Sequence, residues 1–573
     1  MRTRPLKYSR ARFHSKFLRA MFVLFAVGKT SKHVRRNQNL TPELEKSAVT
    51  GKKFAYVTLL CDDGFDAPAY TSLHTLAEHA DLATTDIIVL AHRSISEHIK
   101  NNIRTLGANV INIKHEVPYP FKVTATRAQI HKPCRYSKLL LWTLTQYERI
   151  VYFDLDVIFL QPVNDLFLRD ELTAVPDGNP PDYFNSGIFV AQPNKATFER
   201  MMQHLNLPSY NVGDQGFLNM FFDTWYSGPS GRHLPMTYNA FVRGASFMFW
   251  KSRESDLKII HYTGEHKPWN NIRDIYAEVH GTKAYSSKYE NIWLSAHADA
   301  MLRISCETTR INTEKGVTVV LNGFERMESL KQRVSQFSQF RRVATFVVIW
   351  GNTGKPAPHE TDFEHRGKGV NVVFFGRDKI TDRFLSFMFI KTEGILIVDD
   401  DTTVTEPTFE RAFLTWERDK SRLVGLYPRY HLDTCKDGCI SNVIKYVLNP
   451  SDRYSMVLTK FMFISLSHLK EFMCTRQDVH EYVNQNSNCE DIAMNIMVSK
   501  RTLKPPVYVR DHLKVDSGTR SGLSSRSHHG EFRTTCLRQL LSLFNETTMQ
   551  TNMEAVNVDG SHGPFTTDHF VKS

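Results

Sequence analysis

Two short acidic stretches follow apolar, strand-like runs and have the composition of a site for a hard divalent cation. Asp154-Leu-Asp156 comes after Arg149–Phe153, and Asp399-Asp-Asp401 comes after Gly394–Val398. Side chains on a strand alternate between its two faces, so the first pair of carboxylates points the same way and can share one ion. Such a cation can bridge a nucleotide diphosphate and offset the charge that builds on it as a glycosidic bond breaks. A polar strand end at the surface is the alternative.

The second stretch cannot bind an ion with all of its carboxylates. Three adjacent acids do not all face one ion from a regular strand, so one or two of Asp399, Asp400 and Asp401 are expected to bind metal. The others then meet ribose or backbone donors, and an acidic surface turn is again the alternative. Because Asp-x-Asp recurs by chance, the surrounding sequence has to decide between these interpretations.

Both stretches lie within a repeated α/β pattern. From Lys53 onward, strand-like runs such as Phe54–Leu60 alternate with helix-length stretches such as Ala67–His79, and the alternation restarts at Gly316–Leu321. This pattern is typical of parallel α/β domains, whose ligands bind at the carboxyl ends of the strands. We therefore expect a basic tail at 1–50, an α/β domain at 51–285, a helical and polar linker at 286–313, a second α/β domain at 314–548 and a polar tail at 549–573.

The composition agrees with two globular domains. A chain of 573 residues with 41% hydrophobic and 23% charged residues is too long for one core, and it is neither disordered nor a multi-span membrane protein by composition. The net charge of +12 is uneven, since residues 1–36 hold eleven Lys or Arg and no acid. The remaining residues carry about +1, so we expect no nucleic-acid partner.

The basic tail contains a short apolar run, Ala20–Gly28. Nine residues are fewer than the roughly 20 that span a bilayer as a helix, so a signal peptide or a signal anchor at the membrane is one interpretation and a disordered tail the other. The eight cysteines have no zinc-site spacing. Two sequons, Asn39-Leu-Thr41 and Asn545-Glu-Thr547, are compatible with a lumenal protein.

A set of motifs between residues 53 and 270 occurs in a characteristic order. They are Tyr56–Leu60, Arg135–Lys138 with Leu141-Trp142, Asp154–Asp156, Tyr183–Val190, Gly213–Gly216, Leu234–Asn239 and His261–Trp269. In this order they closely resemble glycosyltransferase family 8, the glycogenin-like enzymes. The resemblance implies a GT-A fold, a Rossmann-like nucleotide-diphospho-sugar transferase domain, that uses a UDP-sugar donor and retains the anomeric configuration.

The same resemblance implies roles for individual residues. It implies Mn²⁺, or another divalent cation, held by Asp154, Asp156 and His261. It further implies nucleotide or phosphate contacts from Tyr56, Lys138 and Lys267, and positions at the sugar for Asn185, Asp214 and Gln215. Among these, Asp214 is the best catalytic candidate and Asn185 the second.

One departure concerns the acceptor. Glycogenin glucosylates a tyrosine that follows its Leu-Pro-x-x-Tyr-Asn segment, whereas Ala240–Met248 contains no tyrosine in this chain. We therefore expect an external acceptor rather than self-priming.

The second half carries a different set of motifs. Gly425–Arg429, Asp452–Val457 and Asn488–Asn495 closely resemble the carboxyl-terminal module of the exostosins, glycosyltransferase family 64, over about residues 314–545. The resemblance implies a second GT-A domain, a UDP-N-acetylhexosamine donor and retention. Glu490 stands where an aspartate is usual in the family, and the loop at Asn322–Arg326 matches only in part, so the donor stays open and GDP-mannose is an alternative.

This second resemblance also implies site residues. Asp401 is the expected metal ligand, Asp491 faces the reacting sugar, and Arg526, counted back from Cys536, stabilises the leaving diphosphate. The expected nucleotide-binding residues are Arg326, Arg383, Asp399 and Asp400. The family likeness further pairs Cys489 with Cys536 in a disulfide, which requires an oxidising lumen.

The sequence as a whole predicts a bifunctional glycosyltransferase of the secretory pathway lumen, Golgi or ER, with type II membrane anchoring as one form. The first domain transfers a hexose or a uronic acid and the second an N-acetylhexosamine, onto a glycan, glycoprotein or glycolipid. Three alternatives stay open: one active domain with a glycan-docking partner domain, a cytoplasmic glycogenin-like primer, and a glycan-binding scaffold without catalysis.

Overall fold

The computed structural model describes most of the chain outside the N-terminal tail. The described residues are 41–46, 50–121, 133–178, 181–242, 252–264, 267–270, 283–308, 314–433, 444–511, 515–516 and 529–566. Contacts divide the chain into two units, Met1–Thr41 and Pro42–Ser573, and every element below belongs to the second unit. The apolar run at 20–28, Asn39 and Arg526 lie outside the described residues.

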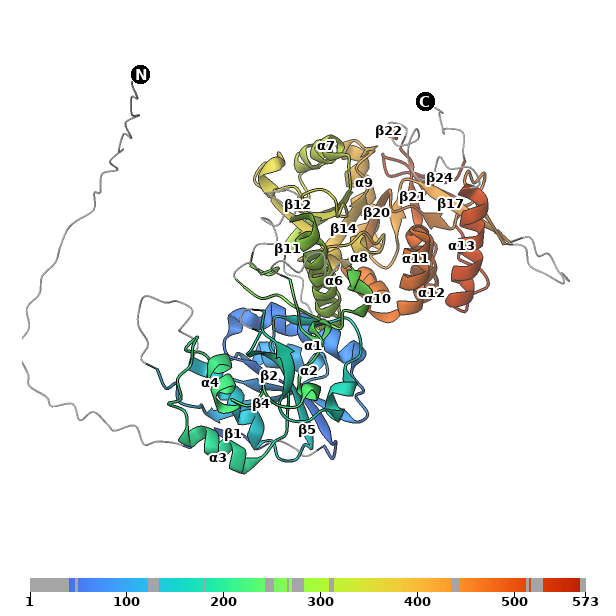
Figure 1. The fold of residues 1–573 in the computed structure, drawn as a ribbon. Coiled ribbons are helices and arrows are strands. Elements are labelled where there is room, and N and C mark those ends of the chain that lie inside the picture. The colour runs from blue at the N-terminus through green and yellow to red at the C-terminus, as the bar shows by residue number, and fades with distance from the viewer. Residues whose placement is uncertain are drawn as a thin grey trace, which may run out of the picture. The chain divides into compact units, whose positions relative to one another are not determined.

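The first half of this unit is built on a seven-stranded sheet with the order β1-β4-β3-β2-β5-β8-β7 (Figure 1). Strands β2, β3, β4 and β5 are parallel, while β8 runs antiparallel to β5. The strands are β1 (Glu43–Leu44), β2 (Phe54–Leu60), β3 (Thr85–Ala91), β4 (Asn109–His115), β5 (Arg149–Phe153), β7 (Thr173–Pro176) and β8 (Phe184–Ala191). The helices are α1 (Asp66–His79), α2 (Glu97–Thr105), α3 (Lys195–Gln203) and α4 (Asp214–Phe221).

A three-stranded sheet, β6-β10-β9, completes this half. It contains β6 (Val157–Phe159), β10 (Ile259–His261) and β9 (Ala240–Phe241). Residues far apart in sequence therefore meet, because β10 pairs with β6, which begins just after the first acidic stretch.

The second half is built on a nine-stranded sheet with the order β13-β12-β11-β14-β20-β16-β21-β23-β24. Its strands are β11 (Glu314–Gly323), β12 (Val343–Trp350), β13 (Gly369–Phe374), β14 (Thr392–Val398), β16 (Val424–Gly425), β20 (Phe461–Ser465), β21 (Val507–Val509), β23 (Glu554–Val556) and β24 (His562–Pro564). Small sheets contain β15 (Thr402–Thr403), β17 (Pro428–Asp433), β18 (Ile444–Val447), β19 (Met456–Val457) and β22 (Val515–Asp516). The helices are α7 (Met327–Ser338), α8 (Asp382–Leu385), α9 (Glu406–Arg418), α10 (Leu466–Thr475), α11 (Gln477–Asn486), α12 (Glu490–Thr502) and α13 (His529–Leu543).

The central strands of both sheets are apolar on both faces, which explains why they are parallel and covered by helices. All seven residues of β3 are buried, as are the last five of β14. Parallel strands occur where both faces of a sheet are covered, and their sequences then read as continuous apolar runs. The α/β class predicted from these runs is confirmed.

The C-terminal segment differs from the polar tail expected at 549–573. Strands β23 and β24 join the edge of the nine-stranded sheet, where β23 pairs with β21. Strands of three residues at a sheet edge need few buried side chains, so their sequence has no clear alternation.

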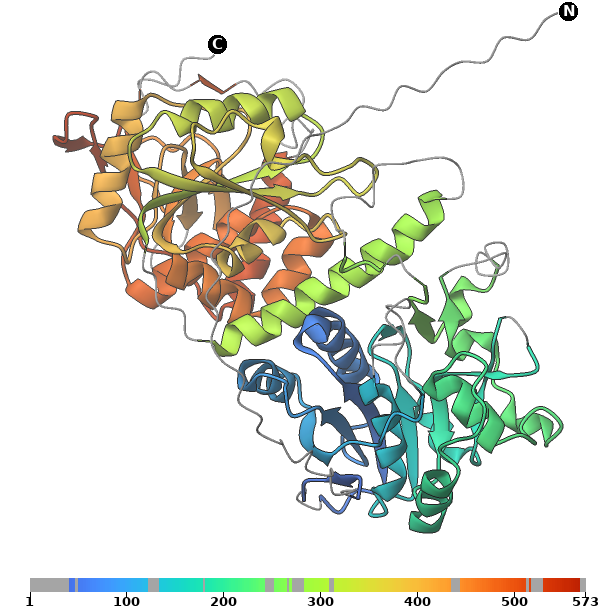
Figure 2. The same cartoon turned by 90° about the vertical axis from the view of Figure 1, so that its left-hand side faces the viewer.

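A single helix, α6 (Lys283–Glu307), occupies the predicted linker region (Figure 2). It packs on α1 and α2 on one side and on α10 on another. His297 Nδ1 lies 2.9 Å from Thr71 Oγ1 of α1, and Asp299 pairs with Arg377 at 2.7 Å. Trp293 is buried in a cluster with residues of both halves. The helix is therefore part of the packed core rather than a solvated connector.

Three disulfides cross-link the described chain. Cys489–Cys536 confirms the pairing implied by the family 64 resemblance, and Cys61–Cys134 and Cys306–Cys474 are additional. Cys306–Cys474 joins the end of α6 to α10. A separate observation concerns membranes: within the described part of the chain, no helix has both the length and the apolar character to cross a bilayer.

Candidate active sites

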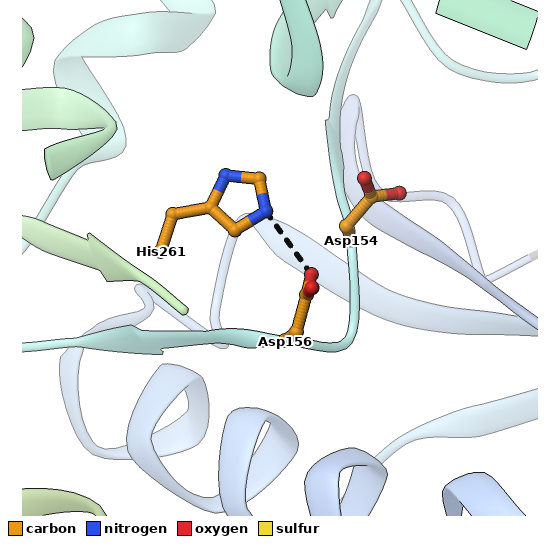
Figure 3. Close-up of side chains that lie close together, drawn as sticks. All are labelled: Asp154, Asp156 and His261. Atoms are coloured by element: carbon orange, nitrogen blue, oxygen red, sulfur yellow. Dashed lines mark ion pairs between the residues drawn. The ribbon is translucent and has the colours of Figure 1, made fainter. Parts of the chain in front are cut away.

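The first acidic stretch lies where β5 ends at the carboxyl edge of the seven-stranded sheet. The Asp154 N–H donates to Gly187 O of β8 at 2.8 Å, and the chain turns so that Asp156 stands directly before β6. Because β10 pairs with β6, His261 at the end of β10 lies beside Asp156. One ligand atom each from Asp154, Asp156 and His261 lies within 4.8 Å of the others (Figure 3). The structure thus brings together the three predicted metal ligands.

The imidazole of His261 is oriented by neighbouring amides. Its Nδ1 lies 2.8 Å from Asn239 Oδ1, and the Asn239 amide nitrogen donates to Asn185 Oδ1 at 2.9 Å. Since an amide oxygen only accepts, Nδ1 donates the hydrogen bond to Asn239, and Nε2 lies 3.1 Å from Asp156 Oδ1. A side chain at Gly187 would collide with this ring, which explains the glycine in the Asn-Ser-Gly motif.

His261 and Lys267 flank the carboxylate of Asp156. Burial alone would raise the pKa of Asp156, but His261 and Lys267 outweigh burial and hold it below its usual value. Lys267 Nζ lies 2.6 Å from Asp156 Oδ2. Asp156 is therefore an ionised carboxylate over the whole neutral range, as a metal ligand must be.

Lys138 links this group to Asp214. Its Nζ is fully enclosed, 2.5 Å from Asp214 Oδ2 and 3.3 Å from Asp154 Oδ1. Burial alone would lower the pKa of Lys138, but the two carboxylates outweigh burial and raise it. Lys138 is thus a fixed positive charge between the metal-ligand group and the predicted catalytic residue, with its ammonium over the ring of Tyr152 at 4.4 Å.

Asp214 begins α4, where the helix dipole favours a carboxylate. Ser186 Oγ donates to it at 3.3 Å. Burial alone would raise the pKa of Asp214, but Lys138 outweighs burial and lowers it. Asp214 is consequently buried and ionised.

Asp177 was not foreseen from the sequence. Its Oδ2 accepts from Asn185 Nδ2 at 3.1 Å and from Gln215 Nε2 at 2.9 Å, so one carboxylate orients both predicted sugar-side amides. The one feature of the sequence that could have indicated Asp177 is that it directly follows a short apolar run, β7.

Tyr56 does not join this group. Its side chain is fully buried against Phe159 and Phe167, and its hydroxyl donates to Asn164 Oδ1 at 2.9 Å. The predicted nucleotide contact from Tyr56 is therefore not supported, because its face of β2 points into the core rather than toward the ligand edge.

The second acidic stretch follows β14, and its three carboxylates do not all share one partner. Arg326 lies 2.5 Å from Asp400 Oδ1 and 3.2 Å from Asp401 Oδ2, and Lys460 lies 3.4 Å from Asp401 Oδ1. Asp399 instead lies 3.4 Å from Arg383. Burial raises the pKa of Asp400 to about 6, against the opposing charge of Arg326. This division matches the expectation that three adjacent acids do not act together.

Arg383 connects Asp399 to the loop of the Asn488–Asn495 motif. Its Nη1 lies 3.4 Å from Glu490 Oε1. Its Nη2 and Nε donate to the Asn322 amide oxygen at 2.9 and 3.0 Å, in the amide orientation that satisfies both partners. Glu490 also accepts from Thr459 at 3.0 Å. Burial raises the pKa of Glu490 in spite of the Arg383 charge.

Arg533 is the arginine that the structure places at Asp491. Its Nη2 lies 2.7 Å from Asp491 Oδ1 and 2.6 Å from Oδ2, and its Nη1 donates to Asn488 at 2.9 Å. Burial alone would lower the pKa of Arg533, but Asp491 outweighs burial and raises it. Arg526, which was predicted to stabilise the leaving diphosphate, lies outside the described residues. The missed signal was helical spacing, because Arg533 stands one turn before the disulfide-bonded Cys536 on α13.

The two sites differ in their ligand types. Among the described residues, Asp154, Asp156 and His261 form the one group of three His, Cys, Asp or Glu side chains close enough to share an ion. The second site has the acids of one strand end and two arginines instead.

Comparison with known proteins agrees with this division. Residues 56–273 match the model of the family "Glycosyl transferase family 8", and residues 317–559 match that of the "Glycosyl transferase family 64 domain". The chain is 30% identical to glycogenin-1 of Oryctolagus cuniculus over 247 residues, which cover 42% of this chain and 74% of that protein. It is 26% identical to human exostosin-like 2 over 257 residues, which cover 43% of this chain and 78% of that protein.

A solved structure, the apo form of the bifunctional glycosyltransferase WbbM, is similar at 19% identity with a TM-score of 0.35, covering 44% of this chain and 51% of that one. The two family matches lie on the two α/β halves that contain the two candidate sites. The chain therefore belongs to glycosyltransferase family 8 through residues 56–273, its residues 317–559 match the family 64 domain, and it is a glycosyltransferase with two α/β domains.

Proposed function

We propose that the protein is a bifunctional, retaining glycosyltransferase that transfers a hexose or a uronic acid at its first site and an N-acetylhexosamine at its second, both from UDP-sugars. One observation carries this proposal: each half encloses a carboxylate paired with a buried cation beside an acidic strand end. The pairs are Asp214 with Lys138 and Asp491 with Arg533. An inactive docking domain has no need to keep so costly a buried ion pair.

The ligand set of the first site fits a divalent cation such as Mn²⁺. Two carboxylates and an imidazole whose other nitrogen is held by an amide are suitable donors for such an ion. When bound, the ion supplies positive charge to the nucleotide diphosphate. For the second site we propose Asp401 as the ligand, with Arg326 and Arg383 at the nucleotide, near Asp399 and Asp400.

The remaining chemistry belongs to side chains of the chain. At the first site, Lys138 provides a positive charge for the donor phosphates, and Asp214 provides an ionised carboxylate for the sugar. Asn185 and Gln215, both held by Asp177, orient the sugar. At the second site, Asp491 holds the corresponding position, and two hydrogen bonds from Arg533 Nη2 fix its carboxylate in one orientation.

We further propose that the protein works in the lumen of the secretory pathway on an external glycan, glycoprotein or glycolipid. Three disulfides favour an oxidising compartment. The absence of tyrosine from Ala240–Met248 favours an external acceptor over self-priming. A cytoplasmic glycogenin-like primer is the alternative that free cysteines in the native protein would favour.

The test uses the full-length chain and a panel of UDP-sugars with GDP-mannose. Asp156→Asn is expected to abolish manganese-dependent hydrolysis of one donor and Asp401→Asn that of a second, each leaving the other donor's turnover intact. Asp170→Asn and Asp452→Asn change exposed carboxylates of the same two halves and serve as matched controls. Manganese titration followed by electron paramagnetic resonance is a readout that does not depend on activity, and Asp156→Asn should lose one binding site.

Two outcomes separate the alternatives. If one donor only is turned over, the protein is a single catalyst with a docking domain. If either variant silences both donors, the sites are not independent and the bifunctional proposal fails.

A further inference from the structure

The segment that follows α13 presents the sequon Asn545-Glu-Thr547 on the surface. The helix ends at Leu543, and Asn545 has a φ of 54°, the left-handed conformation that commonly ends a helix. Its N–H donates to Ser542 O at 3.0 Å, and the Glu546 N–H donates to Leu541 O at 2.9 Å. The backbone of this turn is therefore satisfied by the helix and needs nothing from the Asn545 side chain.

Buried and charged side chains next to the sequon hold this turn against the second α/β domain. Phe544 is buried, and Lys500 of α12 donates to Phe544 O at 2.5 Å and lies 3.2 Å from Glu546 Oε1. Asn545 and Thr547 are both exposed, and among the described residues neither side chain has a hydrogen-bond partner. An ordered turn thus holds the amide and the hydroxyl of the sequon outward into solvent.

We propose that Asn545 is an N-glycosylation site. The amide nitrogen of Asn545 forms a bond to C1 of the first sugar of a lipid-linked oligosaccharide, the bond from C1 to the lipid diphosphate breaks, and the amide loses one proton to solvent. The proposal rests on the lumenal location that is part of the proposed function, because the donor lipid and its transferase face that compartment.

The position is compatible with catalysis by the second domain. Asn545 stands twelve residues after Arg533, which corresponds to roughly 18 Å along a helix. The glycan is therefore attached beyond the far end of α13 from the Asp491–Arg533 pair. We expect occupancy of the site to leave turnover at the second site unchanged.

The chain contains its own negative control. Asn449-Pro-Ser451 has the outer residues of a sequon and Asn449 is exposed, but the central proline excludes modification. The other complete sequon, Asn39-Leu-Thr41, is removed by Asn39→Gln, so that any glycan that remains reports on Asn545.

The experiment expresses the full-length Asn39→Gln chain in eukaryotic cells and measures its intact mass before and after enzymatic release of N-glycans. Release should remove one glycan and convert Asn545 to aspartate, which peptide mass spectrometry locates. Thr547→Ala should abolish the glycan and Thr547→Ser should keep it. Asn545→Gly, which suits the left-handed backbone, should abolish it without disturbing the turn.

Thiol labelling of the same sample reports whether the six disulfide cysteines are oxidised. This measurement distinguishes failure of the Asn545 site from failure of the proposed lumenal location. Disulfides without a glycan at Asn545 would overturn the proposed site while leaving the lumenal location standing. Free thiols together with an unmodified Asn545 would overturn both. A glycan that persists in Thr547→Ala would show that another residue carries it, and the assignment would be wrong.

Discussion

Replacing Arg533 by methionine tests how the second site depends on a buried ion pair. The side chains of Arg533 and Asp491 are 7% and 6% exposed, and both carboxylate oxygens lie within 2.7 Å of one guanidinium nitrogen. Removing one partner of such a pair leaves an uncompensated buried charge and costs about 3–5 kcal/mol. In Arg533→Met we therefore expect Asp491 to lose its fixed orientation, and turnover at the second site to fall by about 100- to 1000-fold, as for loss of one preorganised electrostatic partner.

The assay is hydrolysis of each donor by the full-length variant, with turnover at the first site as the internal control for folding. Arg533→Lys keeps the charge but not the planar fork, so it should lose less than Arg533→Met. Arg538→Met changes an exposed arginine on the same helix and is the matched control. Undiminished turnover of the second donor in Arg533→Met, or equal loss of both donors, would refute this reasoning.

Three further predictions concern stability, each measured by denaturant unfolding. Tyr262→Phe removes the hydroxyl that donates to Tyr289 O of α6 at 2.6 Å and should lower the free energy of unfolding by about 1–3 kcal/mol, whereas exposed Tyr226→Phe should have no effect. Replacing Cys306 and Cys474 together by serine opens a link across 168 residues and should cost about 2–4 kcal/mol, and equal unfolding midpoints under oxidising conditions would contradict it. Burial lowers the pKa of His297 to about 4, so on acidification the unfolded chain binds a proton at this residue before the folded chain does. The free energy of unfolding should therefore decrease as pH falls from about 6.5 to 4, by at most about 3 kcal/mol. His297→Gln should reduce this dependence of the free energy of unfolding on pH.

The three metal-ligand residues of the first site could be predicted because each stands in a short contiguous motif at a strand end. Asp154 and Asp156 follow β5, and His261 ends β10, so the pairing of β10 with β6 is the one non-local fact needed. Tyr56 shows the limit of this reasoning, since the motif places it on a strand without saying which face it occupies.

The second site could be predicted less fully, because its parts come from separate helices. Asp491 was found in its motif, but its ion-pair partner Arg533 lies on a different helix, α13, and only the fold brings the two side chains together. Disulfides have the same difficulty: Cys61 and Cys134 are 73 residues apart, and only the fold shows that they meet.

The hydrogen bonds of Arg533 bear on what this residue does in the reaction. Its two terminal nitrogens are used by Asp491, Asn488 and Tyr446, while its Nε is buried and, among the described residues, has no partner. A leaving diphosphate could therefore bind Nη2 only by displacing Asp491 or Tyr446. Arg533 is better placed to fix the orientation of Asp491 than to bind phosphate. Arg533→Met should therefore lower kcat at the second site and leave the KM for the donor nearly unchanged, whereas a phosphate-binding role would raise KM as well.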